Sequence, residues 1–159
     1  MSTTRISRRV HASRERVYRA FLDPRDVAIW KVPTGMTCEV HTSEPQEGGA
    51  IRISLTYEES ATAGKTNAHT DTYHGRFVKL IPNEEIVEVV EFETPDPTMQ
   101  GEMTLTTTFR EVDGGTEVIS LHEGVPPGIS PSDNELGWTE AFDKLAALVE
   151  AGQDTTPPG

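Results

Sequence analysis

Apolar and polar residues alternate along most of the middle of the chain. From Ile51 to Tyr57 every second residue is apolar and the residues between are polar, the period of two expected for a strand with one buried face. Similar runs rich in Val, Ile and Thr predict further strands at residues 3–10, 36–42, 70–81, 85–93, 101–112 and 116–124. The segment Asp113-Gly114-Gly115 separates the last two runs and is typical of a hairpin turn.

Two short helices are predicted between the first two strands. Ser13 stands where a helix N-cap is expected, and the apolar residues after it recur on one helical face that includes Phe21. Asp23-Pro24 ends this helix and begins the next, because proline suits the first turn of a helix. The second helix carries Trp30 on its apolar side.

A longer helix is predicted near the C-terminus. Its apolar stripe steps by four, three and four residues: Trp138, Phe142, Leu145 and Val149. Ser132 or Asp133 is expected to cap this helix, and Gly152 to end it. A helix with such a stripe must lie on another element, so the order of elements predicts a two-layer α+β domain. We expect residues 1–151 to form this single domain and residues 152–159 to be a disordered tail.

Composition narrows the class of protein. The 159 residues fit one domain. Lys and Arg number 14 and Asp and Glu 26, a formal net charge of -12, so nucleic acid and anionic membrane surfaces are not expected as partners. The single cysteine, Cys38, cannot form an intramolecular disulfide and is expected to be a small core residue. Because residues 1–10 hold no apolar run of signal-peptide length and no segment could span a membrane, we expect a cytoplasmic protein.

No metal or cofactor is predicted. His69 and His74 are five residues apart and therefore point to opposite faces of a strand, while His69 and Asp71 share a face but lack a third ligand. The sequence contains no phosphate-binding loop, no dinucleotide fingerprint and no Gly-x-Ser-x-Gly motif.

Short motifs follow one another along the chain in this order: Val10-His11-Ala12-Ser13, Val17 to Phe21, Asp23-Pro24, Trp30, Gly48-Gly49, Gly75 to Val78 with Pro82, Gly114 to Val118, His122 to Val125, and Gly137-Trp138 with Lys144-Leu145. The series resembles the activator of heat-shock-protein (Hsp) ATPase homologue family, in the START-like, birch-pollen-allergen-like helix-grip (SRPBCC) superfamily. The resemblance implies a curved antiparallel sheet of about seven strands wrapped around a long C-terminal helix, with two short helices after the first strand. It also implies a cavity that takes lipid-like, polyketide-like or other apolar ligands.

Nine side chains are expected to line such a cavity, on the helix stripe or on the inward face of the sheet: Trp30, Ile53, Leu55, Tyr57, Phe77, Leu105, Trp138, Phe142 and Leu145. No catalytic residue is assigned. His122, Arg76 and Glu88 are candidates, because an inward polar group in an apolar pocket could orient a ligand carbonyl or carboxylate, and His122 could act as a general base. The alternative is that each faces solvent or satisfies a local hydrogen bond.

Three functions therefore stay open. The first is a protein that binds an apolar or lipid-like small molecule without chemistry. The second is a cyclase or dehydratase acting on an aromatic or polyketide-like substrate, which needs a buried acid or base within reach of the ligand. The third is an interaction module for a chaperone or for a second copy of the chain in a homodimer, using the exposed side of the same apolar face.

Overall fold

Seven antiparallel strands form one sheet in the order β1-β7-β6-β5-β4-β3-β2. The computed structural model describes residues 2–57 and 70–154. The strands are β1 (Ser2–Val10), β2 (Met36–Ser43), β3 (Ala50–Tyr57), β4 (Thr70–Ile81), β5 (Glu85–Phe92), β6 (Met103–Val112) and β7 (Gly115–Val125). Consecutive strands from β2 to β7 are neighbours, and β1 completes the sheet beside β7.

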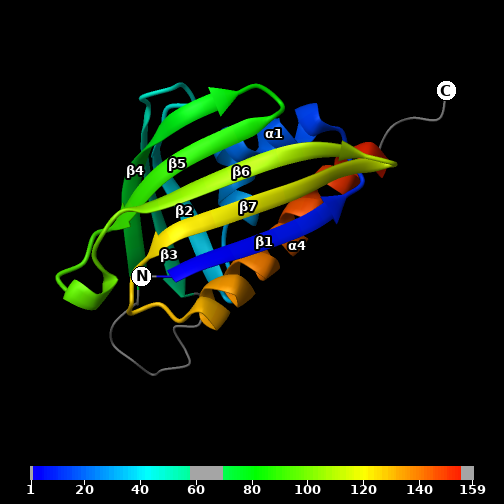
Figure 1. Cartoon of the computed structure of the whole chain (residues 1–159). Helices are drawn as coiled ribbons and strands as arrows, with labels where there is room; N and C mark the ends of the chain where they lie inside the picture. The colour runs from blue at the N-terminus through cyan, green and yellow to red at the C-terminus, as the bar shows by residue number, and fades with distance from the viewer. Residues whose placement is uncertain (1, 58–69, 155–159) are drawn as a thin grey trace.

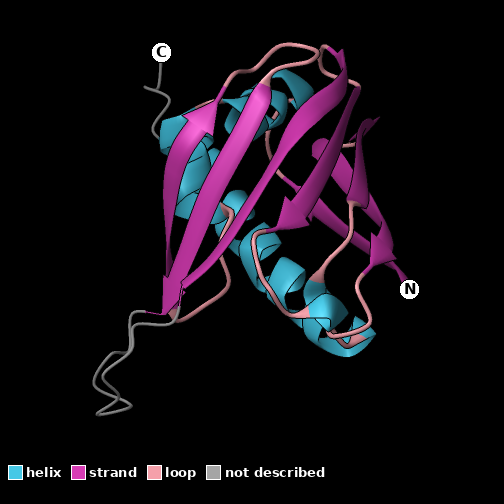
Figure 2. Ribbon diagram, turned by 90° about the vertical axis from the view of Figure 1, so that its left-hand side faces the viewer, coloured by secondary structure: helices cyan, strands magenta, loops and turns pink. Residues whose placement is uncertain are grey.

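Three α-helices and one short 3-10 helix complete the described fold: α1 (Arg14–Leu22), α2 (Pro24–Trp30), η1 (Pro97–Met99) and α4 (Pro131–Asp154). The sheet bends around α4, which lies against its concave side, as Figure 1 and Figure 2 show from two directions. The predicted α+β helix-grip architecture is therefore confirmed. Among the helices described, none has the length and apolarity needed to cross a membrane.

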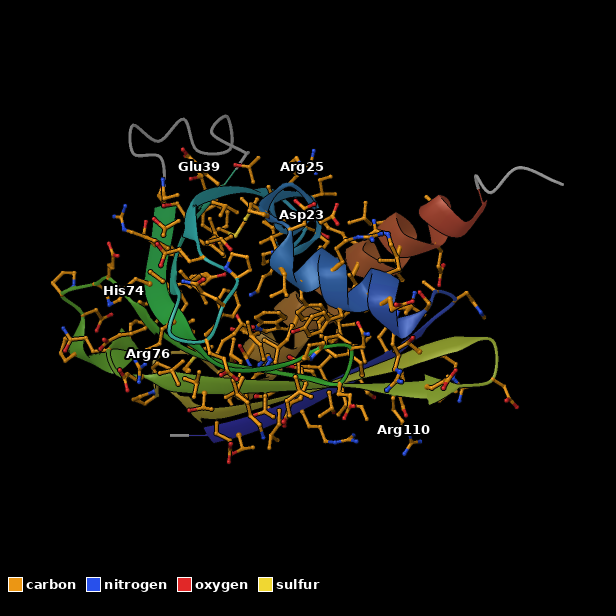
Figure 3. All side chains as sticks on the ribbon, turned by 90° about the horizontal axis from the view of Figure 1, so that it is seen from above. Asp23, Arg25, Glu39, His74, Arg76 and Arg110 are labelled. Atoms are coloured by element: carbon orange, nitrogen blue, oxygen red, sulfur yellow. The ribbon has the colours of Figure 1, made fainter. Side chains whose placement is uncertain are left out.

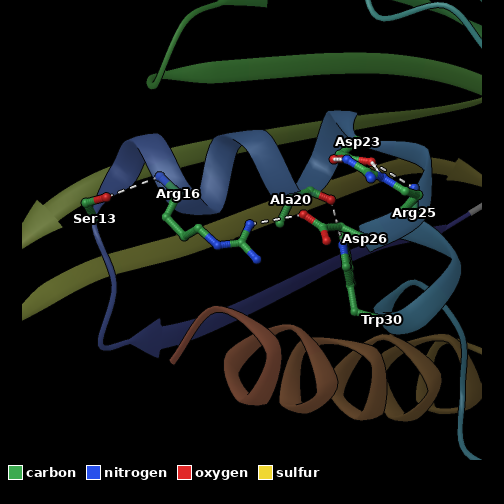
Figure 4. Close-up of polar contacts among 7 residues, drawn as sticks. All are labelled: Ser13, Arg16, Ala20, Asp23, Arg25, Asp26 and Trp30. Atoms are coloured by element: carbon green, nitrogen blue, oxygen red, sulfur yellow. Dashed lines mark hydrogen bonds and ion pairs between the residues drawn. The ribbon is translucent and has the colours of Figure 1, made fainter. Parts of the chain in front are cut away.

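The two short helices begin where the sequence predicts (Figure 4). The Ser13 hydroxyl accepts a hydrogen bond of 3.2 Å from the backbone N–H of Arg16, the usual N-cap contact. The Asp23 carboxylate accepts one of 2.9 Å from the backbone N–H of Arg25 and caps α2, with Pro24 in the first turn. One aspartate therefore ends α1 and starts α2, which fixes the angle between the helices.

Side chains of α1 and α2 lock this pair onto the core. Arg16 Nη1 lies 3.0 Å from Asp26 Oδ2, which joins the two helices. The fully buried Trp30 donates its indole N–H to the backbone carbonyl of Ala20 at 2.8 Å (Figure 4). The Trp30 ring also lies 6.0 Å from that of Phe142 on α4, so the short helices and the long one share one aromatic core.

The long helix begins and ends slightly outside its predicted limits. Its N-cap is Ser130 rather than Ser132 or Asp133, because the Ser130 hydroxyl accepts a hydrogen bond of 3.0 Å from the backbone N–H of Asp133. Pro131 then occupies the first helical position, for which its fixed φ is suited. At the other end α4 continues past Gly152 to Asp154, and residues 155–159 of the expected tail lie outside the described part of the chain.

Candidate ligand-binding site

Strand register places one row of side chains across the middle of the concave face. Phe77 on β4 is opposite Glu88 on β5, Glu88 is opposite Leu105 on β6, and Leu105 is opposite His122 on β7. All four side chains are buried, and the most exposed of them, Leu105, is only 4% exposed. The row therefore puts a carboxylate and an imidazole into an otherwise apolar interior, where each needs a partner.

A cavity of about 350 Å³ lies beside this row, between the concave face of the sheet and the N-terminal half of α4. Met99 from η1 and Ile129 from the connector before α4 border one end of it. The body of the cavity is apolar, with side chains that include Val90, Phe92 and Met103. The volume falls at the small end of the range of about 300–1,000 Å³ that is usual for ligand pockets.

Lys31 contributes a positive charge to the described part of the cavity wall. Its Nζ lies 2.9 Å from Glu88 Oε1, and the two side chains are only 6% and 3% exposed. Burial by itself would lower the pKa of Lys31, but the neighbouring Glu88 carboxylate more than offsets this and raises the pKa above its ordinary value. Lys31 is therefore an ammonium held in a buried ion pair, and its Nζ also lies 5.9 Å from the centroid of the Trp138 ring.

His122 forms the centre of a buried chain of hydrogen bonds. Its Nε2 lies 2.9 Å from Ser120 Oγ, which in turn lies 3.1 Å from Thr107 Oγ1, and its Nδ1 lies 3.3 Å from the side-chain nitrogen of Asn134 on α4. An amide nitrogen only donates, so Nδ1 accepts and Nε2 carries the proton. Burial, helped by the charge of Lys31, lowers the pKa of His122 to about 4. The ring is therefore neutral at physiological pH, with both nitrogens engaged.

Two further polar side chains, Tyr73 and Cys38, lie close to Lys31. Burial raises the pKa of Tyr73, a residue that borders the cavity, so its hydroxyl stays protonated. Within the described residues no hydrogen bond engages that hydroxyl. Burial also raises the pKa of the Cys38 thiol to about 11, which leaves it protonated and a poor nucleophile.

The sequence and the fold of this chain resemble those of known proteins. A family model described as "Activator of Hsp90 ATPase homolog 1-like protein" matches residues 11–150. The chain belongs to this family. A solved Chromobacterium violaceum protein is 33% identical, with a TM-score of 0.84 over 94% of this chain and 99% of that one. No curated protein gives a significant match.

More distant structures share the fold of this activator-homologue family member. A Rhodobacter sphaeroides protein is 21% identical, with a TM-score of 0.77 over 94% of this chain and 93% of the other. The AHSA1 protein of Silicibacter pomeroyi is 16% identical, with a TM-score of 0.78 over 95% of this chain and 99% of that one. The likeness at these identities concerns the arrangement of helices and sheet alone.

The structure separates the predicted pocket residues of this family member into two groups. Four border the cavity: Leu55, Tyr57, Leu105 and Trp138. Five belong to the hydrophobic core, each no more than 3% exposed: Trp30, Ile53, Phe77, Phe142 and Leu145. The physical reason is that Phe21 of α1 and Trp30 of α2 pack on Phe142, which makes this part of α4 core, and the cavity borders α4 only as far as Ala141. Lys31, Tyr73 and Asn134 border the cavity without having been among the nine predicted residues.

Of the three catalytic candidates, two lie on the concave side of the sheet and one on its outer side. His122 borders the cavity, and Glu88 holds Lys31 beside it. Arg76 lies on the outer side of β4, away from the helices (Figure 3), with its side chain 51% exposed and 3.5 Å from Glu102. The reason is strand alternation, since its neighbour Phe77 takes the inward position.

His74, one of the two histidines considered as metal ligands, lies on the same outer face, with its side chain 51% exposed. The Nδ1 atom of His74 is 3.0 Å from Glu93 Oε2, and His74 lies next to Arg76 in Figure 3. Two hydrogen bonds from Arg52 to the same carboxylate hold the pKa of Glu93 at about 2. No group of three or more potential metal ligands occurs among the described residues, and His69 lies outside them.

Proposed function

We propose that this member of the activator-homologue family binds a small apolar molecule in the cavity between α4 and the sheet. The cavity itself supports this most directly, because a space of about 350 Å³ bordered by Met, Phe, Val and Trp side chains can remove much of a small apolar ligand from water. Three of its polar groups, Lys31, His122 and Asn134, are held by hydrogen bonds to other side chains, so they can orient a ligand without moving.

Binding without chemistry fits the three catalytic candidates, His122, Glu88 and Arg76, better than cyclase or dehydratase activity. A general base needs a free nitrogen or carboxylate within reach of the ligand. His122 has both ring nitrogens in hydrogen bonds and a pKa of about 4, and Glu88 is engaged by Lys31. Arg76 lies on the opposite face of the sheet.

The first measurement is native mass spectrometry of the purified protein. A co-purifying apolar molecule of a few hundred daltons supports the proposal and gives its class. The same spectrum reports a homodimer or a bound chaperone, which are the partners predicted under the alternative of an interaction module.

The second measurement uses the two tryptophans as an internal pair. Trp138 borders the cavity, whereas Trp30 is buried in the core with its indole N–H bonded to a backbone carbonyl. Titration with 2-acetylnaphthalene, a neutral bicyclic ketone, is expected to shift the indole ¹H–¹⁵N signal of Trp138 and to leave that of Trp30 nearly unchanged.

A matched pair of variants places the binding. Ala141 borders the cavity and is 3% exposed, so Ala141→Leu fills part of the space and is expected to weaken the ketone at least tenfold. Ala151→Leu adds the same carbons at an exposed position of α4 and serves as the control. Equal shifts of both tryptophans, or equal affinity in the two variants, would contradict binding in this cavity.

A further inference from the structure

A second hollow, of about 690 Å³, lies next to the cavity, between α2, β2 and the C-terminal half of α4. It follows the cavity along one stripe of α4. The cavity borders this helix as far as Ala141, and the second hollow borders it at Lys144 and Leu148, three and seven residues further on. Val32 and Met36 border both spaces. These two side chains therefore form a partition between the cavity and the second hollow.

The two side chains of the partition differ in their freedom to move. Val32 is 3% exposed and branched at Cβ, which restricts its rotamers. Met36 is unbranched and flexible, and it has space on both sides, so it can adopt another rotamer. The backbone before it is held, because the Pro33 carbonyl accepts a hydrogen bond of 3.2 Å from Lys144 Nζ. We therefore expect the partition to open by rotation of the Met36 side chain.

The second hollow holds apolar surface that is in contact with water. Ile29 is 57% exposed and borders the hollow, together with Ala28, Ala147 and the half-buried Leu148. Covering such surface is favourable in proportion to the apolar area removed from water. A compact ligand confined to the cavity leaves this surface wet, whereas an elongated ligand covers it once Met36 has turned aside.

We propose that the ligand is an elongated apolar molecule, with a compact part in the cavity and an alkyl tail that passes Met36 into the second hollow. This rests on the proposed function and adds the shape of the ligand to it. In the second hollow the tail lies along α4, against Ile29 and Leu148. Met36 is then the residue that determines how long a ligand the protein accepts, because its rotamer decides whether the two spaces are joined.

Two ketones that share a naphthalene ring and differ in the length of the acyl chain test this on the wild-type protein. They are 2-acetylnaphthalene and 2-decanoylnaphthalene, each followed by the indole signal of Trp138 and the methyl signals of Leu148. The decanoyl ketone is expected to bind about tenfold more tightly or better, because its tail covers apolar surface that the acetyl ketone leaves in water. It is also expected to shift the Leu148 methyl signals, which the acetyl ketone leaves in place. A decanoyl ketone that gains no affinity, or that does not shift Leu148, would overturn the inference.

Ala147→Leu and Ala151→Leu are a matched pair that locates the tail. Both add the same carbons at exposed positions of α4, but Ala147 borders the second hollow and Ala151 lies one turn beyond it. Ala147→Leu is expected to remove most of the preference for the decanoyl ketone, about tenfold, whereas Ala151→Leu keeps it. Equal preference in the two variants would show that the tail lies elsewhere, which contradicts the inference.

Met36→Ile tests the partition itself. Isoleucine has a similar size but is branched at Cβ, so it cannot turn aside as methionine does, and the preference for the decanoyl ketone is expected to fall. An unchanged preference in the folded variant would count against Met36 as the length-determining residue, and if this variant does not fold, the alanine pair decides. Failure of both ketones to shift Trp138 in the wild type would instead reject the proposed function, which separates the two conclusions.

Discussion

The buried His122 gives a pH dependence that can be calculated and removed by one substitution. His122 is 1% exposed, and its pKa of about 4 lies below the ordinary value of 6.5. Between these two values the unfolded chain binds a proton that the folded protein excludes. The stability is therefore complete above about pH 6.5 and is lost as the pH falls toward 4.

The size of this stability change follows from the difference between the two pKa values of His122. Each tenfold change in proton affinity corresponds to about 1.4 kcal/mol, so the whole interval amounts to about 3 kcal/mol. By pH 5, where most of the interval has been crossed, the loss is about 2 kcal/mol. Because the imidazole is buried, no large reduction for solvent screening is needed.

His122→Gln removes the titration while keeping a side chain that can both accept from Asn134 and donate to Ser120. Urea unfolding at pH 7.5 and pH 5.0 measures the effect. The advantage of the wild type over the variant is expected to shrink by about 2 kcal/mol at the lower pH. His11→Gln, at an exposed position, is the control and is expected to keep the wild-type pH dependence. Parallel pH profiles for wild type and His122→Gln would refute the reasoning.

Other substitutions test the ion pair, the cap and the core. Lys31→Met is expected to lower the free energy of unfolding by about 3–5 kcal/mol because Glu88 keeps a buried charge, and Glu88→Leu in the same chain to restore most of it; urea melts that show no recovery would contradict this. Ser130→Ala is expected to cost about 1 kcal/mol and Ser132→Ala less than half as much, and equal losses in thermal melts would remove the assignment of the cap. Trp30→Phe is expected to cost about 2 kcal/mol or more, since a buried carbonyl of α1 loses its donor; a smaller loss in urea would show that the carbonyl finds another partner.

The order and type of the elements could be predicted because each carries its own local signal. The strand predicted at residues 70–81 is β4 (Thr70–Ile81), and the hairpin at Asp113 and Gly114 joins β6 and β7. Ser13 and Asp23 cap the helices that they were expected to cap. Such signals lie within a few residues of the feature they specify, so no tertiary information is needed to interpret them.

The inward face of a strand could be predicted only where one residue fixes the alternation. In β4 the buried Tyr73 and Phe77 share one face, which sends Arg76 to the other. In β5 Glu88 has the same parity as Ile86 and is buried with it. Both strands alternate between an inward and an outward face. In β5, however, Val87 and Val89 flank Glu88, so both faces carry apolar residues and the sequence does not show which one is buried.

The burial of Lys31 could not be predicted from strand alternation. Lys31 follows directly after α2, where no period applies, and a lysine after a helix is most often exposed. Its partner Glu88 is 57 residues away in the sequence. The two meet because α2 packs on the edge strand β2 and on α4, and the curved sheet brings its middle strand β5 within reach of the residue after α2. The division between cavity wall and core had the same cause, since Trp138 and Phe142 belong to one helical stripe and differ only in what lies opposite them.

The buried pair also separates stability from function. Replacing a buried ion pair by apolar side chains of similar size is often neutral or stabilising by about 1–4 kcal/mol, because the desolvation of two charges is avoided. If Lys31→Met with Glu88→Leu is as stable as the wild type, the pair contributes little to folding that apolar residues could not supply. Its position in the wall of the cavity would then be the property that distinguishes it, and the same double variant is expected to bind 2-acetylnaphthalene with a changed affinity. A variant that is stable and binds the ketone as tightly as the wild type would show that the pair is not needed for ligand binding either.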